Sequence, residues 1–360
     1  MTGTPWLTKP PGACQRRRRA CYAAVGIVLV ALVAMTGVAA VRHWGRASTF
    51  AFVGCRAEPS LVDVMTTFAY QPGDGNRATG IVLTAAGEVV TNNHVIAGAG
   101  TVTVRDLVDG RRYAATVVGS DVTDDVAVLR LEGADDLEAA TLGLGTSIAR
   151  GEQILAIGNG NGTCGSPTVT SGTIVGLGSM TVASDGPNDM SLPLTGMVQV
   201  TAPLEPGDSG GALVDHAGRV IGMLTAGYRD ASGGYLGFAI PISRVVDIAR
   251  QIVAGRASFT IHVGPTASLG AQFSCLDYPA TDFLSGILIT AVSAGSPAER
   301  GGLRSGDVVT WFARHRIQSP AQMTELLQRE RPGDVVQVAW TDGVGATHQA
   351  AMTLVSGPPQ

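Results

Sequence analysis

The sequence predicts a mostly β protein of two folded units behind an N-terminal membrane helix, and three observations lead to this prediction. The chain of 360 residues exceeds one typical domain. Its 48 glycines and its many short apolar runs, separated by Gly, Asp, Asn and Pro clusters, are typical of a sandwich or barrel. A stretch from Ala20 to Val41 contains no charged or amide side chain.

That uncharged stretch predicts the first elements of the chain. About 20 helical residues at ~1.5 Å each cross a ~30 Å hydrocarbon layer. Arg16 to Arg19 directly before it favour a cytoplasmic N-terminus and an extracytoplasmic body. The alternative is a signal peptide cleaved near Ala40, which would release a secreted form. The predicted order is a cytoplasmic basic tail at 1–20, a transmembrane helix at 21–41 and a tether at 42–57.

The body of the chain is mildly acidic. The whole chain has a formal net charge of −4, although the charged side chains of residues 1–41 are all basic. The remainder therefore carries a net charge of about −9. Without a basic stripe, this charge argues against a nucleic acid as partner.

Three of the five cysteines follow the predicted membrane helix, in a compartment where disulfides can form. Cys55 and Cys164 fall within or beside the same predicted domain, so our hypothesis is that they pair and leave Cys275 free. The spacings match no zinc pattern, and no metal is predicted.

Short strands fill the first unit, predicted at 58–255. Runs such as "ATGIVLT", "DVAVLRL", "EQILAIG" and "RVIGMLTAG" are apolar and bounded by turn residues. The unit ends in "SRVVDIARQIVAG", whose helical period puts Val245, Ile248 and Ile252 on one face, with Ser243 as the candidate N-cap. A linker is predicted at 256–265.

The second unit, predicted at 266–355, mixes strands and helices. Its strands are "GILITAVS", "DVVTWFA" and "DVVQVAW". Two helices are predicted near "SPAERGG" and "SPAQMTELLQRE". Both begin with serine followed by proline, which is a helix-start signal.

The stretch "PGDSGGALV" raises the question of a nucleophile at Ser209. A serine hydroxyl reacts only when a base takes its proton and a third group orients that base. His94 in "TNNHVI" and Asp125 in "TDDVAVLRL" stand at strand ends and are the candidates. Each residue alone would more often be a surface or turn residue. Together, the order His94, Asp125, Ser209 is that of the two-barrel serine proteases.

Glycines around Ser209 predict an oxyanion hole. Gly207 and Gly210 allow the chain to turn so that the N–H groups of Gly207 and Ser209 point at one spot. Removing one such donor costs ~3 kcal/mol of transition-state stabilisation.

These blocks, together with "AIGNGNG", "TVTSGTIVGLG" and "GFAIPI", resemble in order and spacing the HtrA/DegP family of trypsin-like serine proteases, particularly its membrane-associated actinobacterial members. The resemblance covers roughly residues 60–355. It implies a double β-barrel with the catalytic cleft between the barrels, then a PDZ domain, acting outside the cytoplasm in protein quality control without a cofactor. Asp208 stands where many relatives have asparagine, which leaves open its partner and whether the oxyanion hole is preformed.

The resemblance also implies a specificity pocket. Its base lies six residues before the nucleophile, at Pro203, with Leu204 beside it. Leu224, Thr225 and Ala226 are the predicted wall. An uncharged pocket cannot offset the desolvation of a cation, so we expect cleavage after Val, Ala or Ile.

In the second unit, the loop "SLGAQF" is the predicted peptide site. PDZ domains bind a peptide carboxylate through consecutive backbone N–H groups. Leu269, Gly270 and Ala271 are the candidate donors.

The function expected from these features is that of a membrane-tethered serine endopeptidase acting on unfolded or C-terminally exposed polypeptides. The alternative is a PDZ-based peptide sensor or chaperone with little or no protease activity. Trimers held by aromatic residues are common in the family, so a homotrimer is implied as well. The compatible aromatic residues are Phe50, Phe52, Phe68 and Tyr70.

Overall fold

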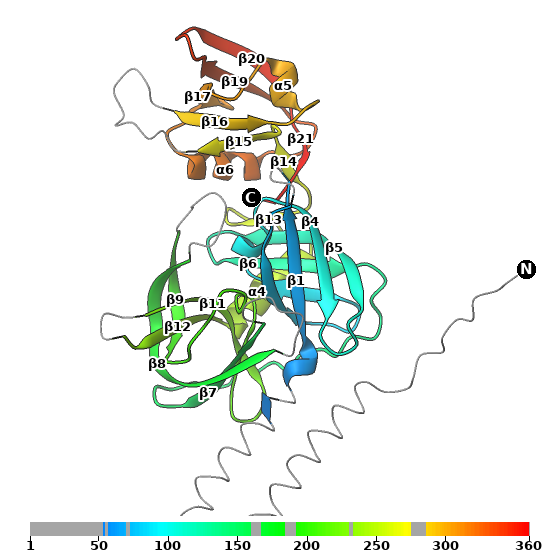
Figure 1. Cartoon of the computed structure of the whole chain (residues 1–360), viewed down its shortest axis with the longest axis vertical. Coiled ribbons are helices and arrows are strands. Elements are labelled where there is room, and N and C mark those ends of the chain that lie inside the picture. The colour runs from blue at the N-terminus through cyan, green and yellow to red at the C-terminus, as the bar shows by residue number, and fades with distance from the viewer. Residues whose placement is uncertain are drawn as a thin grey trace, which may run out of the picture.

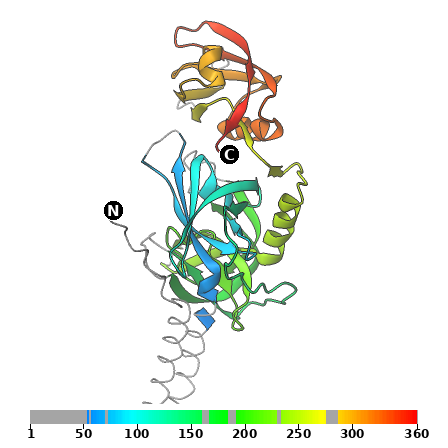
Figure 2. The same ribbon diagram turned by 90° about the vertical axis from the view of Figure 1, so that its right-hand side faces the viewer.

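The computed structural model describes residues 53–54, 57–69, 73–159, 167–183, 192–229, 233–274 and 286–359. The predicted basic tail, the membrane helix and most of the tether lie outside these residues, as do Cys55, Cys164 and Cys275. Within the described ranges, no helix is long and apolar enough to cross a membrane. The described chain forms two β-barrels packed together and a smaller second unit beyond them (Figure 1 and Figure 2).

The first barrel is a seven-stranded antiparallel sheet in the order β13-β5-β4-β1-β2-β3-β6, closed by pairing of β5 with β6. A short helix, α3 (Asn93–Ile96), follows β3. The strands are β1 (Leu61–Phe68), β2 (Arg77–Val82), β3 (Glu88–Thr91), β4 (Ala99–Asp106), β5 (Arg112–Asp121), β6 (Val126–Leu131) and β13 (Ile261–Val263).

The second barrel is a closed ring of strands in the order β10-β11-β12-β9-β8-β7. These strands are β7 (Gln153–Gly158), β8 (Thr168–Ala183), β9 (Leu192–Val200), β10 (Ala212–Val214), β11 (Val220–Arg229) and β12 (Tyr235–Pro241). The sequence prediction of a barrel-type first unit is therefore confirmed, because strand pairing closes both sheets into rings.

A shared apolar core holds the two barrels together. Val126 and Val128 of β6 pack in one cluster with Leu155 and Ile157 of β7, while Leu129 points into the core of the first barrel alone. Since side chains alternate along a strand, the Val126–Leu129 part of β6 is buried on both faces and is a continuous apolar run, which ends at the exposed Arg130.

Helix α4 (Ile242–Val253) follows β12 and packs on the shared core. Its predicted buried face is confirmed, because Val245, Ile248 and Ile252 are all buried. The predicted N-cap was wrong. The cap position is Pro241, without a side-chain cap bond, because β12 runs directly into the helix and Ser243 already lies within the first turn.

The second unit is a six-stranded sheet with two helices and a separate two-stranded ribbon. Helices α5 (Pro297–Gly301) and α6 (Pro320–Arg329) start as predicted: the hydroxyls of Ser296 and Ser319 accept the N–H groups of Glu299 and Gln322. The sheet contains β15 (Ala271–Ser274), β16 (Ile287–Val292), β17 (Val308–Phe312), β18 (His315–Arg316), β19 (Val335–Thr341) and β20 (Thr347–Thr353), and the ribbon pairs β14 (Thr266–Ser268) with β21 (Val355–Gly357).

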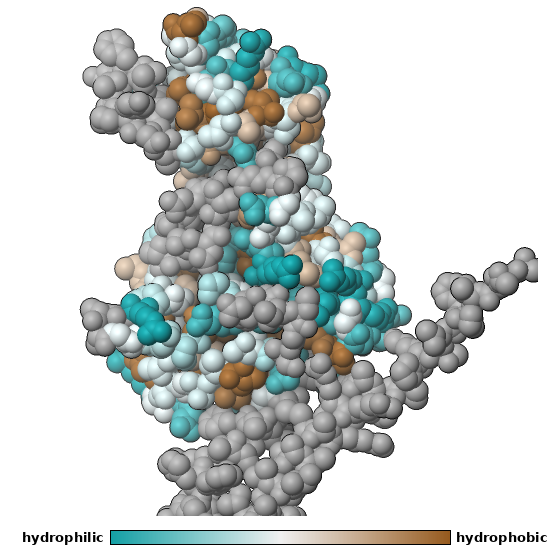
Figure 3. All heavy atoms as spheres, viewed as in Figure 1, coloured by the Kyte–Doolittle hydropathy of each residue, from teal (hydrophilic) through white to brown (hydrophobic). Residues whose placement is uncertain are grey.

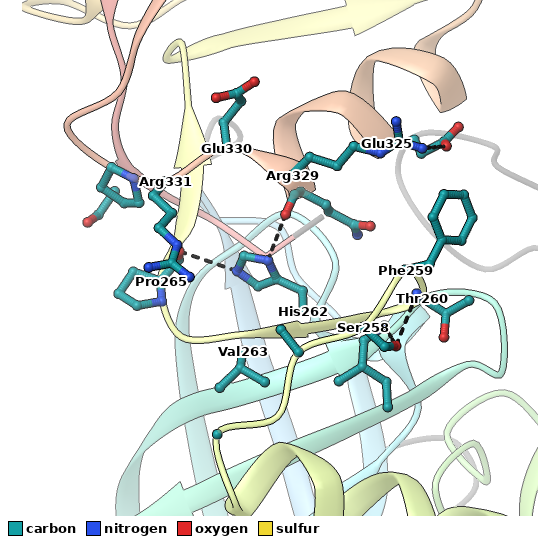
Figure 4. Close-up of a pocket in the computed structure, with 16 residues that line it drawn as sticks. Ser258, Phe259, Thr260, His262, Val263, Pro265, Glu325, Arg329, Glu330 and Arg331 are labelled. Carbon is teal, nitrogen blue, oxygen red and sulfur yellow. Dashed lines mark hydrogen bonds and ion pairs between the residues drawn. The ribbon is translucent and has the colours of Figure 1, made fainter.

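The predicted linker is partly sheet. β13 pairs with β5 of the first barrel, and Gly119 allows this because a Cβ there would lie 2.4 Å from the His262 carbonyl oxygen. The two nitrogens of the His262 ring face the carbonyl oxygens of Gln328, at 3.1 Å, and Pro265, at 3.3 Å (Figure 4). A half-open cavity of about 820 Å³ lies at the same junction, between residues 255–265 and the C-terminal end of α6.

Polar side chains cover much of the visible face of both units. In Figure 3, brown apolar residues on this face are interspersed with white and teal residues. This distribution is expected for domains whose larger apolar side chains are packed inside.

We predict that the free energy of unfolding depends on pH through Asp106, at the end of β4. Burial raises the pKa of its carboxyl from 3.8 to about 6. A raised pKa means that the folded state favours the protonated form, so stability is lost as the pH rises from about 4 to about 6. Asn keeps an oxygen acceptor for the Val108 N–H and cannot ionise. Asp106→Asn should therefore stabilise the fold by about 1–2 kcal/mol at pH 7.5 and leave it almost unchanged at pH 4.

Calorimetric melting of wild type and variant at both pH values measures this effect. The exposed Asp135→Asn variant is the control for removing one acidic charge nearby. Equal stabilisation by Asp106→Asn at pH 4 and pH 7.5 would contradict the titration of Asp106.

Candidate active site

The three predicted catalytic residues come from both barrels and meet where the barrels touch. His94 lies on α3, directly after β3, and Asp125 directly precedes β6, so the first barrel supplies both. Ser209 lies in the turn before β10 of the second barrel. β3 and β6 are neighbours in the sheet, which brings the histidine and the aspartate to the same edge.

Asp125 holds His94 through both of its carboxylate oxygens. Oδ2 lies 2.9 Å from the ring Nδ1, and Oδ1 accepts the backbone N–H of His94 at 3.0 Å. From the second barrel, the Thr225 hydroxyl donates to the same Oδ2 at 2.6 Å. The imidazole is therefore fixed in place with its Nδ1 directed at a buried carboxylate.

Asp125 adopts a backbone conformation that most residues avoid. Its φ is +54°, in the left-handed region that aspartate tolerates better than larger side chains. The Nδ2 of Asn92 donates to the Asp125 carbonyl at 3.0 Å and holds this conformation. The turn thus presents the carboxylate to His94 instead of continuing the strand.

The Ser209 hydroxyl donates to the Thr225 carbonyl oxygen at 3.3 Å. This is a long bond for a hydroxyl donor. A serine held this weakly can change rotamer, and catalytic hydrogen bonds often tighten only when substrate binds.

The turn around Ser209 leaves two N–H groups available. The N–H groups of Asp208, Gly210 and Gly211 donate to the carbonyls of Glu205, Leu224 and Asp208, respectively. Among the described residues, the Gly207 and Ser209 N–H groups donate to no protein acceptor. They are the two donors that the sequence predicts for an oxyanion.

Asp208 has a partner that the sequence left open. Its Oδ2 accepts the N–H of Glu205 at 2.9 Å, and the side chain is buried. Gly158 at the end of β7 allows this close packing, because a Cβ there would lie 2.5 Å from Asp208 Oδ1. The carboxylate therefore stabilises the turn that carries Ser209.

Two of the residues predicted for the specificity pocket do not face an open surface, and the pocket itself stays a prediction. The Leu224 side chain packs in the core of the second barrel, and the Thr225 hydroxyl binds Asp125, so neither lines a pocket. Ala226 is half-buried, and the Pro203 carbonyl accepts the Thr170 hydroxyl at 3.1 Å.

Sequence reasoning missed two glycines that lie against Leu204, a residue of the predicted pocket. The Leu204 side chain lies over Gly227 of β11 and Gly237 of β12, which are paired in the sheet. A Cβ at either glycine would lie 3.0 Å from Leu204. Leu204 thus fills the space that small residues on these two strands leave open.

The predicted peptide loop of the second unit is buried. Leu269 and Ala271 are buried, and Gly270, with a φ of +73°, donates its N–H to the Ser268 hydroxyl at 2.9 Å. The strand that follows, β15, is the edge strand of its sheet. Carboxylate binding by Leu269, Gly270 and Ala271 stays a prediction.

Among the predicted trimer contacts, only Phe68 is described, on β1, while Phe50, Phe52 and Tyr70 lie outside the described residues.

Within the described part of the chain, no group of three or more His, Cys, Asp or Glu side chains could hold a metal ion.

Comparisons with known proteins decide the family. Residues 78–223 match the trypsin-like peptidase domain and residues 267–341 match the PDZ domain. The serine protease PepD of Mycobacterium tuberculosis is 32% identical, over 97% of this chain and 81% of PepD. The chain belongs to the HtrA/DegP family of serine proteases.

Other similar proteins match this chain over different shares of their own length. A probable periplasmic DegP-like serine endoprotease of Hahella chejuensis is 33% identical over 71% of this chain, and the match spans 52% of that relative. Among solved structures, the HtrA-type protease AlgW with a tripeptide is 30% identical, with a TM-score of 0.49 over 86% of this chain and 98% of AlgW. The two family matches show that this protease contains a trypsin-like domain followed by a PDZ domain.

Proposed function

We propose that this protease is an endopeptidase in which Ser209 is the nucleophile, His94 the general base and Asp125 the group that orients His94. The observation that carries the proposal is the pair of hydrogen bonds that Asp125 forms with the ring and the backbone N–H of His94. The Thr225 hydroxyl adds a third hydrogen bond to the same carboxylate. A carboxylate held in this way fixes both the position and the tautomer of the imidazole.

The chemistry follows from this arrangement. With the proton on Nδ1 shared with Asp125, Nε2 takes the proton of Ser209 as the hydroxyl oxygen attacks the peptide carbonyl. The N–H groups of Gly207 and Ser209 receive the negative oxygen that forms. His94 then passes the proton to the leaving amine, and water hydrolyses the acyl-enzyme by the same steps.

The triad variants test these roles. Ser209→Ala and His94→Ala should each lower kcat for peptide hydrolysis by ~10⁴-fold, because nucleophile and base act as a unit. Asp125→Ala should cost somewhat less. Near-wild-type turnover by Ser209→Ala or His94→Ala, in protein shown by circular dichroism to be folded, would contradict the assignment.

The same variants separate the endopeptidase from the alternative function. If the protein were a PDZ-based sensor or chaperone, wild type and Ser209→Ala would bind peptides equally well and neither would hydrolyse them. We favour the endopeptidase because Asp125 holds His94, because Thr225 contacts both Asp125 and Ser209, and because the Gly207 and Ser209 N–H groups are available beside Ser209.

We further propose that the protease cuts unfolded polypeptides after small aliphatic residues. Leu204 and the surrounding glycines form an apolar surface without a carboxylate among the residues named for the pocket. A lysine or arginine side chain there would lose its hydration without a counter-charge, whereas Val, Ala or Ile would gain by burial.

Leu204 sets the depth of this pocket, so Leu204→Gly should admit larger residues. We expect wild type to cut mostly after Val, Ala and Ile, and the variant to shift toward Leu, Met and Phe. The volume-conserving Leu204→Met is the control and should keep the wild-type preference. Mass spectrometry of digests of an unfolded protein reads the cleavage sites directly, and a majority of cuts after Lys or Arg would mean that the pocket is elsewhere.

The PDZ domain is proposed to bind exposed C-termini of substrates. Peptide addition to the free edge of β15 would use main-chain hydrogen bonds, with the carboxylate at Leu269, Gly270 and Ala271. Binding there requires the Gly270 N–H to exchange its bond to Ser268 for one to the carboxylate.

We propose that the protease is anchored in the membrane by residues 21–41, with its catalytic domain outside the cytoplasm. A periplasm-active reporter fused after Gly264 should work, because Arg16 to Arg19 retain the N-terminus inside. Activity of a cytoplasm-only reporter at the same position would contradict this orientation. Release of the body into the medium would instead indicate cleavage near Ala40.

A further inference from the structure

Thr79 of β2 is fully buried and forms four hydrogen bonds with three other segments of the chain. Its N–H donates to the Ser209 carbonyl at 2.8 Å, and its hydroxyl donates to the Gly207 carbonyl at 2.8 Å. The same hydroxyl accepts the N–H of Asn159, at the end of β7, at 2.9 Å. Its own carbonyl accepts the Thr91 hydroxyl at 2.8 Å.

Two of these bonds fix the peptide units next to Ser209. The unit that joins Gly207 to Asp208 is held at its carbonyl by the Thr79 hydroxyl and at its N–H by the Glu205 carbonyl. The unit that joins Ser209 to Gly210 is held at its carbonyl by the Thr79 N–H and at its N–H by the Leu224 carbonyl.

The peptide unit between them carries a proposed oxyanion donor. Its carbonyl, on Asp208, accepts the Gly211 N–H at 2.9 Å. Because a peptide unit is planar and trans, this bond directs the Ser209 N–H to the opposite side. The direction of that donor therefore depends on neighbouring units that Thr79 holds.

Behind Thr79 lies a buried polar chain that fixes its partner Asn159. The Asn159 side chain donates to Asp63 of β1, and the Arg105 side chain of β4 donates to the other oxygen of Asp63, with Nε at 2.7 Å. Asp63 and Asn159 are both buried. The Thr79 hydroxyl thus connects the catalytic turn with a buried polar network that joins β1 and β4 of the first barrel to Asn159, after β7 of the second.

We propose that the Thr79 hydroxyl is a positioning group for catalysis, which sets the turn of Gly207 and Ser209 so that their N–H groups meet the oxyanion. The proposal rests on the proposed roles of Ser209 and Gly207. Without the hydroxyl, the Gly207 carbonyl and the Asn159 N–H both lose a partner inside the barrel contact, and the turn moves to find others.

The test compares Thr79→Val with Thr79→Ser. Valine has the shape of threonine without the hydroxyl, and a displacement of ~1 Å costs ~10²-fold in rate, so we expect kcat to fall ~10–100-fold with KM almost unchanged. Serine keeps the hydroxyl and should stay within ~3-fold of wild type, losing only the rotamer preference of a β-branched side chain.

Ser60→Ala is the matched control. It also removes a buried hydroxyl bonded at 2.8 Å to a backbone carbonyl, that of Ala57, but in another part of the first unit. This variant should lose stability while kcat stays at the wild-type value. A similar loss of kcat in Ser60→Ala and Thr79→Val would show that Thr79 acts only through stability, and would overturn the proposal.

A second readout reports on the oxyanion directly. A peptide boronate forms a tetrahedral adduct whose oxygen lies where the oxyanion forms, so its affinity should fall in Thr79→Val by the same factor as kcat. Unchanged boronate affinity would overturn the proposal. If Thr79→Val does not fold, Thr79→Cys replaces it: the thiol is a weak donor, so kcat should lie between wild type and a ~100-fold loss, and a wild-type kcat would overturn the proposal.

Ser209→Ala is measured in parallel, so that the two hypotheses can fail separately. If Ser209→Ala hydrolyses peptides normally, the proposed function is wrong. If Ser209→Ala is inactive but Thr79→Val and Thr79→Ser have equal kcat, only the role of Thr79 is wrong.

Discussion

Buried polar groups of one barrel form hydrogen bonds with residues of the other barrel, and the geometry of the active site depends on these bonds. Each barrel alone carries an incomplete site, with His94 and Asp125 in the first and Ser209 in the second. Thr225 donates across the contact to Asp125, and Thr79 donates across it to Gly207. Since an unsatisfied buried group costs about 1–3 kcal/mol, a displacement of one barrel against the other would be unfavourable at several places at once. The apolar cluster shared by the barrels supplies the attraction, and these polar bonds set the register.

The contact between the barrels also requires the backbone at Gly210 to lie close to the backbone of β2. Gly210 has a φ of +78°, and a Cβ there would lie 2.0 Å from the Thr79 carbonyl oxygen. No larger residue could occupy this position without moving β2 away from Ser209. The glycine after the serine in "GDSGG" is thus explained by the contact between the barrels.

The sequence predicted those features that depend on local chemistry. The order of His94, Asp125 and Ser209, the serine caps of α5 and α6, and the buried face of α4 follow from short patterns. Features set by three-dimensional proximity could not be predicted: Thr79 and Gly207 are 128 positions apart in the chain. Leu224 and Thr225 do not line a common wall with Ala226, because Leu224 packs in the barrel core and Thr225 binds Asp125, and the β-bulge between Leu224 and Ala226 is not visible in the sequence.

Labelling of the full chain with a peptidyl phosphonate, without any added peptide, tests most directly whether the two barrels hold a complete site. The phosphonate forms a stable bond only to a serine with a base and oxyanion donors in place. We predict one adduct per chain, located on Ser209 by tandem mass spectrometry and absent from His94→Ala. Absence of an adduct from the folded wild-type chain, or an adduct on a different serine, would contradict the account.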